Sequence, residues 1–286
     1  MAALCPCYPS ISGTLRIRNL EDSADLSGLS CIEQTGGLVI SDNESLSSLD
    51  GLESLQLVEG SVSIQENTLL SDISGLGGLT EIDEALIVED NPVLPDLSGL
   101  ASLATVSGGL TLTANTSLTH IGLSALEEIG KVSISSCEGL EEINALTSLT
   151  TVARELSIEG CTGLTTLELP ALVSVGDELY LYNNAALETV SLPELSEVGG
   201  ELRLHWIAAL TDLDGLSGVQ SVGDGLVLWG NALLSDVSGM HNVESIDGDL
   251  TVANNPKLAT DDAEALRDAI DTDNISGSVT LSNNGS

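Results

Sequence analysis

The chain has 286 residues, with 44 acidic side chains against seven basic ones and a formal net charge of −37 at pH 7. A surface this negative repels DNA, RNA and anionic lipid, which excludes nucleic acid as a partner, and no apolar run is long enough for direct membrane insertion. Hydrophobic residues make up 42% of the chain but aromatic residues only 2%, and Phe is absent, so the core must consist of Leu, Ile and Val.

Residues 1–36 precede the first full repeat and are expected to form an N-terminal cap. They begin without a basic region followed by an apolar one, so no export signal is visible in this sequence. Three cysteines fall in this segment: Cys5, Cys7 and Cys31. We expect a disulfide within this group, which would place the protein in an oxidising compartment.

Variants of the phrase Gly-x-Leu-x-Ile-x-x-Asn recur twelve times at a spacing close to 24 residues, for example at residues 37–43 and 109–115. Within each phrase the aliphatic residues alternate with small or polar ones, which is typical of a strand with one buried face. Repetition at this period predicts a solenoid, because a single unit cannot bury its apolar face without its neighbours. The first aliphatic position of each phrase is Leu15, Leu38, Val62, Leu86, Leu110, Val132, Leu156, Leu179, Leu202, Leu226, Leu250 or Val279.

Asparagine follows five residues after this first position in eight of the twelve units. Its side chain bonds neighbouring backbone groups and tolerates left-handed backbone, so the stacked amides are expected to form a structural ladder at one corner. The members are Asn43, Asn67, Asn91, Asn115, Asn184, Asn231, Asn255 and Asn284. Cys137 and Cys161 occupy the same column and are expected to be buried thiols rather than a disulfide or a metal site.

These patterns predict an all-β protein, a right-handed parallel β-helix of about twelve coils that forms one domain over residues 1–286. Regular repeats are expected over residues 37–258 and a C-terminal cap over residues 259–286. Within that cap, residues 260–270 read as a short helix, with Asp261 as its N-cap and Glu264 three residues further on.

Four of the five aromatic residues fall in three consecutive units, and three of them share the outward strand face with a cation and an imidazole. Such a group can stack on sugar rings or anchor a protein partner. The competing interpretation is that Tyr and Trp favour strands and support one another laterally. The candidate ligand-binding residues are Tyr180, Tyr182, Arg203, His205, Trp206, Val227 and Trp229.

Carboxylates precede the asparagine column in three successive units, at Asp42, Glu66 and Asp90. Stacked at strand spacing they repel one another, and a bound calcium ion would relieve that repulsion. Screening by water and salt is the alternative. The sequence predicts no other cofactor.

The repeat resembles that of the receptor L-domain family, through phrases such as residues 76–82 and 195–202, and through the opening with Cys7 and residues 25–31. Within that family, the repeat pattern most resembles that of bacterial surface proteins. The resemblance implies an extracellular or cell-envelope location and a binding role towards a protein or carbohydrate at the cell surface. By analogy, Cys31 would pair with Cys7 or Cys5. The cysteine-rich module of the receptors is absent, so their ligand sites cannot be transferred.

The sequence does not predict an enzyme. No nucleophile motif, phosphate-binding loop or metal motif is present, and no carboxylate cluster shares a strand face with Arg203. Two functions from different classes therefore remain: a binding module that uses the aromatic residues, or a passive structural spacer or adhesion scaffold without a specific ligand.

Overall fold

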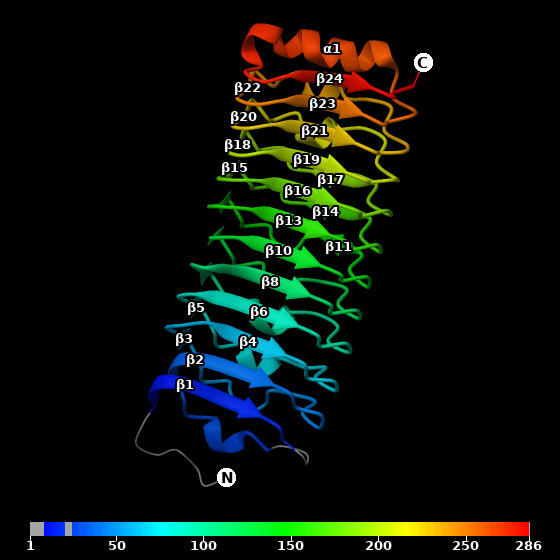
Figure 1. Cartoon of the computed structure of the whole chain (residues 1–286). Helices are drawn as coiled ribbons and strands as arrows, with labels where there is room; N and C mark the ends of the chain where they lie inside the picture. Colours follow the sequence, from blue (N-terminus) through cyan, green and yellow to red (C-terminus); the bar gives the residue numbers. More distant parts are fainter. Residues whose placement is uncertain (1–8, 21–24, 286) are drawn as a thin grey trace. The chain divides into compact units, whose positions relative to one another are not determined.

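The computed structural model describes residues 9–20 and 25–285 as an all-β parallel solenoid with one short C-terminal α-helix (Figure 1). Its contacts divide the chain into two compact units. Unit 1 comprises Met1–Gly130, Ile134–Leu140 and Ala145–Ser148, and unit 2 comprises Lys131–Ser133, Glu141–Asn144 and Leu149–Ser286.

Unit 1 is built on parallel strands that stack in register, one per turn, with shorter strands beside them. In the first pair Leu15 lies opposite Leu38, which then lies opposite Val62 in the next pair, so the aliphatic positions of the phrase are stacked as the sequence predicts. The strands are β1 (Ser10–Arg18), β2 (Gln34–Ser41), β3 (Leu57–Val58), β4 (Val62–Gln65), β5 (Glu81–Ile82), β6 (Ala85–Glu89), β7 (Thr105–Val106), β8 (Gly109–Thr113) and β9 (Glu128–Ile129).

Unit 2 repeats this arrangement in a second set of parallel pairs. Its strands are β11 (Glu142–Ile143), β12 (Thr151–Val152), β13 (Leu156–Glu159), β14 (Thr166–Glu168), β15 (Ser174–Val175), β16 (Leu179–Tyr182), β17 (Thr189–Ser191), β18 (Glu197–Val198), β19 (Leu202–His205), β20 (Ser221–Val222), β21 (Leu226–Trp229), β22 (Ser245–Ile246), β23 (Leu250–Ala253) and β24 (Val279–Ser282). Strand β10 (Val132–Ser135) has residues in both units.

All twelve predicted register positions lie in strands, but they make about ten turns rather than about twelve coils. Helix α1 (Thr260–Ile270) occupies the interval before β24.

Short 3₁₀ turns form some of the corners that join the strands. Apart from Thr272–Asn274, each lies within a phrase such as Asp-Leu-Ser-Gly-Leu at residues 96–100, in which the Asp96 carboxylate accepts a hydrogen bond of 2.8 Å from the Ser98 N–H. Gly99 fits because a Cβ atom there would lie 2.4 Å from the Ile73 carbonyl oxygen. The turns are Ser27–Leu29, Ser74–Leu76, Ser98–Leu100, Asp214–Leu216, Ser238–Met240 and Thr272–Asn274.

The asparagine ladder is confirmed in both units. The Asn91 amide is fully buried and donates to the Ile64 carbonyl at 2.9 Å, while its side-chain oxygen accepts the Asn67 N–H at 3.2 Å. In unit 2, Asn231 donates to the Leu204 carbonyl at 3.0 Å. Each amide therefore bonds backbone groups of an adjacent coil, which satisfies polar groups that the corner buries.

The predicted helix is confirmed over Thr260–Ile270, where it buries Ala263, Leu266 and Ile270. The prediction that Asp261 is its N-cap is wrong, because the N-cap is Ala259. A β-bridge between Ala259 and Gly285 holds the chain extended up to that residue, and Asp261 lies inside the first turn. No helix in the described part of the chain has both the length and the apolarity needed to cross a bilayer.

Candidate functional site

The predicted aromatic residues of unit 2 lie together on neighbouring parallel strands. In the register of β16, β19 and β21, Tyr180 is opposite Arg203, which is opposite Val227. Two residues further on, Tyr182, His205 and Trp229 form a second row. The Leu side chains that alternate with them point into the core, so alternation alone places the two rows on the outer face. We call these six residues together with Trp206 the aromatic strip.

The rings of the strip contact one another. The Tyr182 ring centroid lies 5.2 Å from that of Trp206, which lies 5.5 Å from that of Trp229. His205 contacts both indoles: it is stacked on Trp206 at an interplanar angle of 10°, and its centroid lies 4.8 Å from that of Trp229. The five rings are therefore in mutual contact, at interplanar angles between 10° and 58°.

Trp206 reaches the strip from a position outside the strand. It follows β19 and has left-handed backbone, with φ of 55°. This backbone recurs in the same column of the repeat, where the residues in unit 2 include Gly160, Asn183, Gly230 and Asn254. Glycine and asparagine adopt it readily, whereas a bulky side chain does so at a cost of about 1–3 kcal/mol. Trp206 is nevertheless 43% exposed.

Arg203 is held at the edge of the strip by two carboxylates. It donates to Glu201, its Nη1 lies 3.9 Å from Glu178 Oε1, and its Cζ lies 5.4 Å from the centroid of the Tyr180 ring. Burial acts to lower the pKa of Arg203, but its hydrogen bond to Glu201 and the charges of both glutamates outweigh this and raise it. The guanidinium is therefore charged and locally neutralised.

Two other groups of the strip are uncharged near neutral pH. Burial, followed by the positive charge of Arg203, lowers the pKa of His205 below its ordinary value. Burial and the nearby charge of Glu159 raise the pKa of Tyr180. The imidazole and the phenol are thus neutral hydrogen-bonding groups at pH 7.

Sequence reasoning placed all seven predicted ligand-binding residues in this region but missed three that support them. Glu178 and Glu201 directly precede their strands, outside the alternating positions, and Gly230 belongs to the left-handed column. The signal for the glutamates is the charged residue that occupies this position in consecutive units, at Glu155, Glu178 and Glu201.

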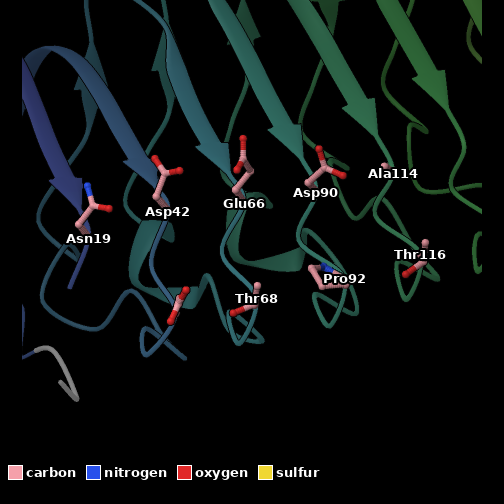
Figure 2. Close-up of a pocket in the computed structure, with 9 residues that line it drawn as sticks. Asn19, Asp42, Glu66, Thr68, Asp90, Pro92, Ala114 and Thr116 are labelled. Carbon is pink, nitrogen blue, oxygen red and sulfur yellow. The ribbon is translucent and has the colours of Figure 1, made fainter. Parts of the chain in front are cut away.

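The predicted carboxylates of unit 1 line a groove of about 660 Å³ (Figure 2). Asp42, Glu66 and Asp90 lie at the ends of successive strands, each with left-handed backbone. Within residues 9–20 and 25–285, no group of three or more His, Cys, Asp or Glu side chains is arranged to hold a metal ion. The three carboxylates form a row along the groove, and calcium binding there stays a prediction. The groove residues are Asn19, Asp42, Glu44, Glu66, Thr68, Asp90, Pro92, Ala114 and Thr116.

Cys31 is disulfide-bonded. Its two candidate partners, Cys5 and Cys7, lie outside the described residues. Cys137 and Cys161 are fully buried thiols, and each donates to the carbonyl of the residue two positions earlier, at 3.5 and 3.7 Å.

Comparison with known proteins adds little to this description. No family model and no curated protein matches the chain. Among solved structures, a leucine-rich-repeat protein of Leptospira interrogans is similar over 88% of this chain and 91% of its own, with 15% identity and a TM-score of 0.21. No argument rests on a TM-score this low, and the fold is taken from the structure itself.

Proposed function

We propose that this leucine-rich β-solenoid is a non-catalytic binding module whose recognition surface is the aromatic strip. The observation that carries the proposal is Trp206, a large and exposed aromatic side chain on a left-handed backbone. The left-handed backbone recurs at this column throughout the repeat, so the feature that sets Trp206 apart is the large exposed ring placed on it.

Backbone geometry does not explain a tryptophan at this position. Asn183 and Asn254 occupy the same column with φ of 54° and 59°, and asparagine adopts that backbone more easily. The indole also needs room, which Gly230 supplies: a Cβ atom there would lie 2.3 Å from Trp206 Cδ1. A costly residue and a glycine that accommodates it together favour a role for the exposed ring.

The chemical groups of the strip support binding rather than catalysis. Ring faces offer apolar contact area, and the neutral imidazole of His205 contacts both indoles. Arg203 is engaged by Glu201 and Glu178. Such groups anchor a partner without breaking bonds in it.

We further propose that the protein acts outside the cell or in the cell envelope, on a protein or carbohydrate partner. The disulfide at Cys31 supports this location, because disulfides persist in oxidising compartments. The net charge of −37 supports the exclusion of nucleic acid.

One observation favours a passive scaffold as the second candidate. The rings contact one another at centroid distances between 4.8 and 6.0 Å, so they could serve mainly to support neighbouring strands. The two functions differ in what happens when a ring is removed: a recognition surface loses its ligand, whereas a scaffold loses stability.

The test is a binding screen of the full chain against a glycan array and a displayed peptide library. Variants Tyr182→Ser and Trp229→Ser should lose every ligand found while keeping the circular dichroism spectrum of the parent. Leu69→Ser is the matched control, because Leu69 is an apolar side chain of unit 1 that is 53% exposed. Binding that survives in both ring variants, or the absence of any ligand, would overturn the proposal.

A further inference from the structure

We infer that the partner of the aromatic strip is an uncharged glycan, bound through a short run of sugar rings. This inference rests on the proposed function and names its ligand class. Three properties of the strip carry it: its size, the residues that border it and its charge.

The strip is small. Neighbouring strands lie about 4.8 Å apart and outward residues of one strand about 7 Å apart, so three strands give a footprint on the order of 100–200 Å². A stable protein–protein interface buries about 800 Å² on each partner. The footprint is therefore too small for a globular protein but suits a few sugar rings in a row.

Small or polar residues border the strip on both sides. On β13, Ser157 and Glu159 lie opposite Tyr180 and Tyr182. On β23, Thr251 and Ala253 lie opposite Val227 and Trp229. The residues that border the rings therefore offer little aliphatic area, and Val227 is the one aliphatic member of the strip. A protein partner would need such area in the centre of its interface.

The chemistry of the rings fits a sugar. One face of a sugar ring presents C–H groups with partial positive charge, which are attracted to the negative π face of an aromatic ring. Beside the ring faces, the Arg203–Glu201 pair combines N–H donors with carboxylate acceptors. Sugar hydroxyls both donate and accept hydrogen bonds, so this pair can serve them from the edge of the strip.

The charge around the strip selects against anionic ligands. The guanidinium of Arg203 is accompanied by Glu178 and Glu201, and Glu159 lies opposite Tyr182 on the neighbouring strand. Three carboxylates against one guanidinium leave the site negative, so a polysaccharide that carries carboxylates or sulfates is repelled. An uncharged glycan avoids this penalty.

Intrinsic fluorescence reports on this site directly, because the chain contains two tryptophans and both belong to the strip. The experiment titrates the full chain with the uncharged probes cellohexaose, chitohexaose and mannohexaose, and with the anionic probe hexagalacturonate. We expect at least one uncharged probe to shift the emission saturably, and hexagalacturonate to bind at least tenfold more weakly.

Two variants show whether the shift arises at the strip. Trp206→Asn retains Trp229 as a reporter and should weaken binding at least tenfold, whereas Leu69→Ser should leave it unchanged. The same proteins are also screened against the displayed peptide library. This screen distinguishes a wrong ligand class from a wrong recognition surface.

If no uncharged probe binds but Trp206→Asn loses a peptide ligand, the assignment of a glycan ligand is overturned, while the proposal that the aromatic strip is a recognition surface stands. If neither glycans nor peptides bind, both are overturned. Hexagalacturonate binding as tight as any uncharged probe would overturn the preference for uncharged glycans.

Discussion

The indole of Trp206 lies against the backbone of Gly230 in the next coil, where an added Cβ atom would come within 2.3 Å of Cδ1 and 2.7 Å of Nε1. Both residues have left-handed backbone, with φ of 55° and 74°. A glycine in one coil thus makes room for an exposed tryptophan in the previous one, and this pairing links the geometry of the repeat to the aromatic strip.

Gly230→Ala should therefore displace the indole. The alanine methyl collides with the ring and also occupies an unfavourable φ, so we expect a loss of about 1–3 kcal/mol in the free energy of unfolding and a shift in tryptophan emission. Gly160→Ala is the control for the backbone, since Gly160 belongs to the same column with φ of 65°. It should lower stability through its unfavourable φ and leave the emission unchanged, because no tryptophan lies at the matching position of the preceding coil. Equal emission spectra for parent and Gly230→Ala would contradict the contact.

The asparagine ladder should dominate the stability of the corners. Asn91→Ala removes the hydrogen bond to the Ile64 carbonyl and leaves the buried Asn67 N–H without its acceptor. We expect a loss of about 2–4 kcal/mol in the free energy of unfolding, measured by urea titration, because buried polar groups left unpaired are costly. Asn242→Ala removes an exposed amide that bonds the Ser217 carbonyl at 2.8 Å and should cost under about 1 kcal/mol. Similar losses in the two variants would contradict a special role for the ladder.

The imidazole in the strip should make stability depend on pH. The pKa of His205 is lowered in the folded state, so the unfolded chain binds the proton more readily. Stability attributable to this residue is constant above the unfolded value of about 6.5 and falls as the pH drops from there through the folded pKa. Comparing urea midpoints between pH 7.5 and 5 should show a smaller decrease in His205→Gln than in the parent. If His205→Gln and the parent show the same pH dependence, the pKa of His205 does not differ between the folded and unfolded states.

The preference of the strip for uncharged over anionic glycans should depend on Glu201. Glu201→Gln removes the carboxylate that engages Arg203 and makes the site less negative. We expect binding of hexagalacturonate to tighten several-fold, and binding of the uncharged probe to weaken because the pair that serves the sugar hydroxyls loses its carboxylate acceptor, as measured by tryptophan fluorescence. Glu244→Gln removes the same charge from an exposed residue outside the strip and should alter neither affinity. A tightening of the same size in both variants would assign the effect to the net charge of the whole chain.

Much of the fold can be predicted from the sequence, because the same hydrophobic pattern recurs in every repeat unit. The alternation around Leu38, Leu86 and Leu110 predicts strands, and the periodic asparagines predict the ladder. The N-cap was misplaced because a bridge between Ala259 and Gly285, distant in sequence, fixes where the helix begins. The 3₁₀ turns depend on local side-chain hydrogen bonds such as that of Asp96, which hydrophobic periodicity does not report.

The candidate site was predictable only in part. Outward strand positions identify Tyr180, Tyr182 and Trp229, since alternation fixes their side. Glycine and asparagine in the same column, as at Gly160 and Asn183, hint at left-handed backbone, but the accommodation of the Trp206 ring by Gly230 emerges only from coordinates. The engagement of Arg203 by Glu178 likewise depends on how far two long side chains reach between neighbouring coils.

The most direct measurement compares Trp206→Asn with the parent in two assays, urea unfolding and glycan titration followed by tryptophan fluorescence. Relief of backbone strain, about 1–3 kcal/mol, offsets the loss of half-exposed ring contacts, about 0.5–1.5 kcal/mol each, so the unfolding free energy should stay within about 1 kcal/mol of the parent. Binding of the uncharged glycan should weaken at least tenfold. A variant that binds as tightly as the parent, or that loses several kcal/mol of stability, would contradict the account and assign the ring to structural support.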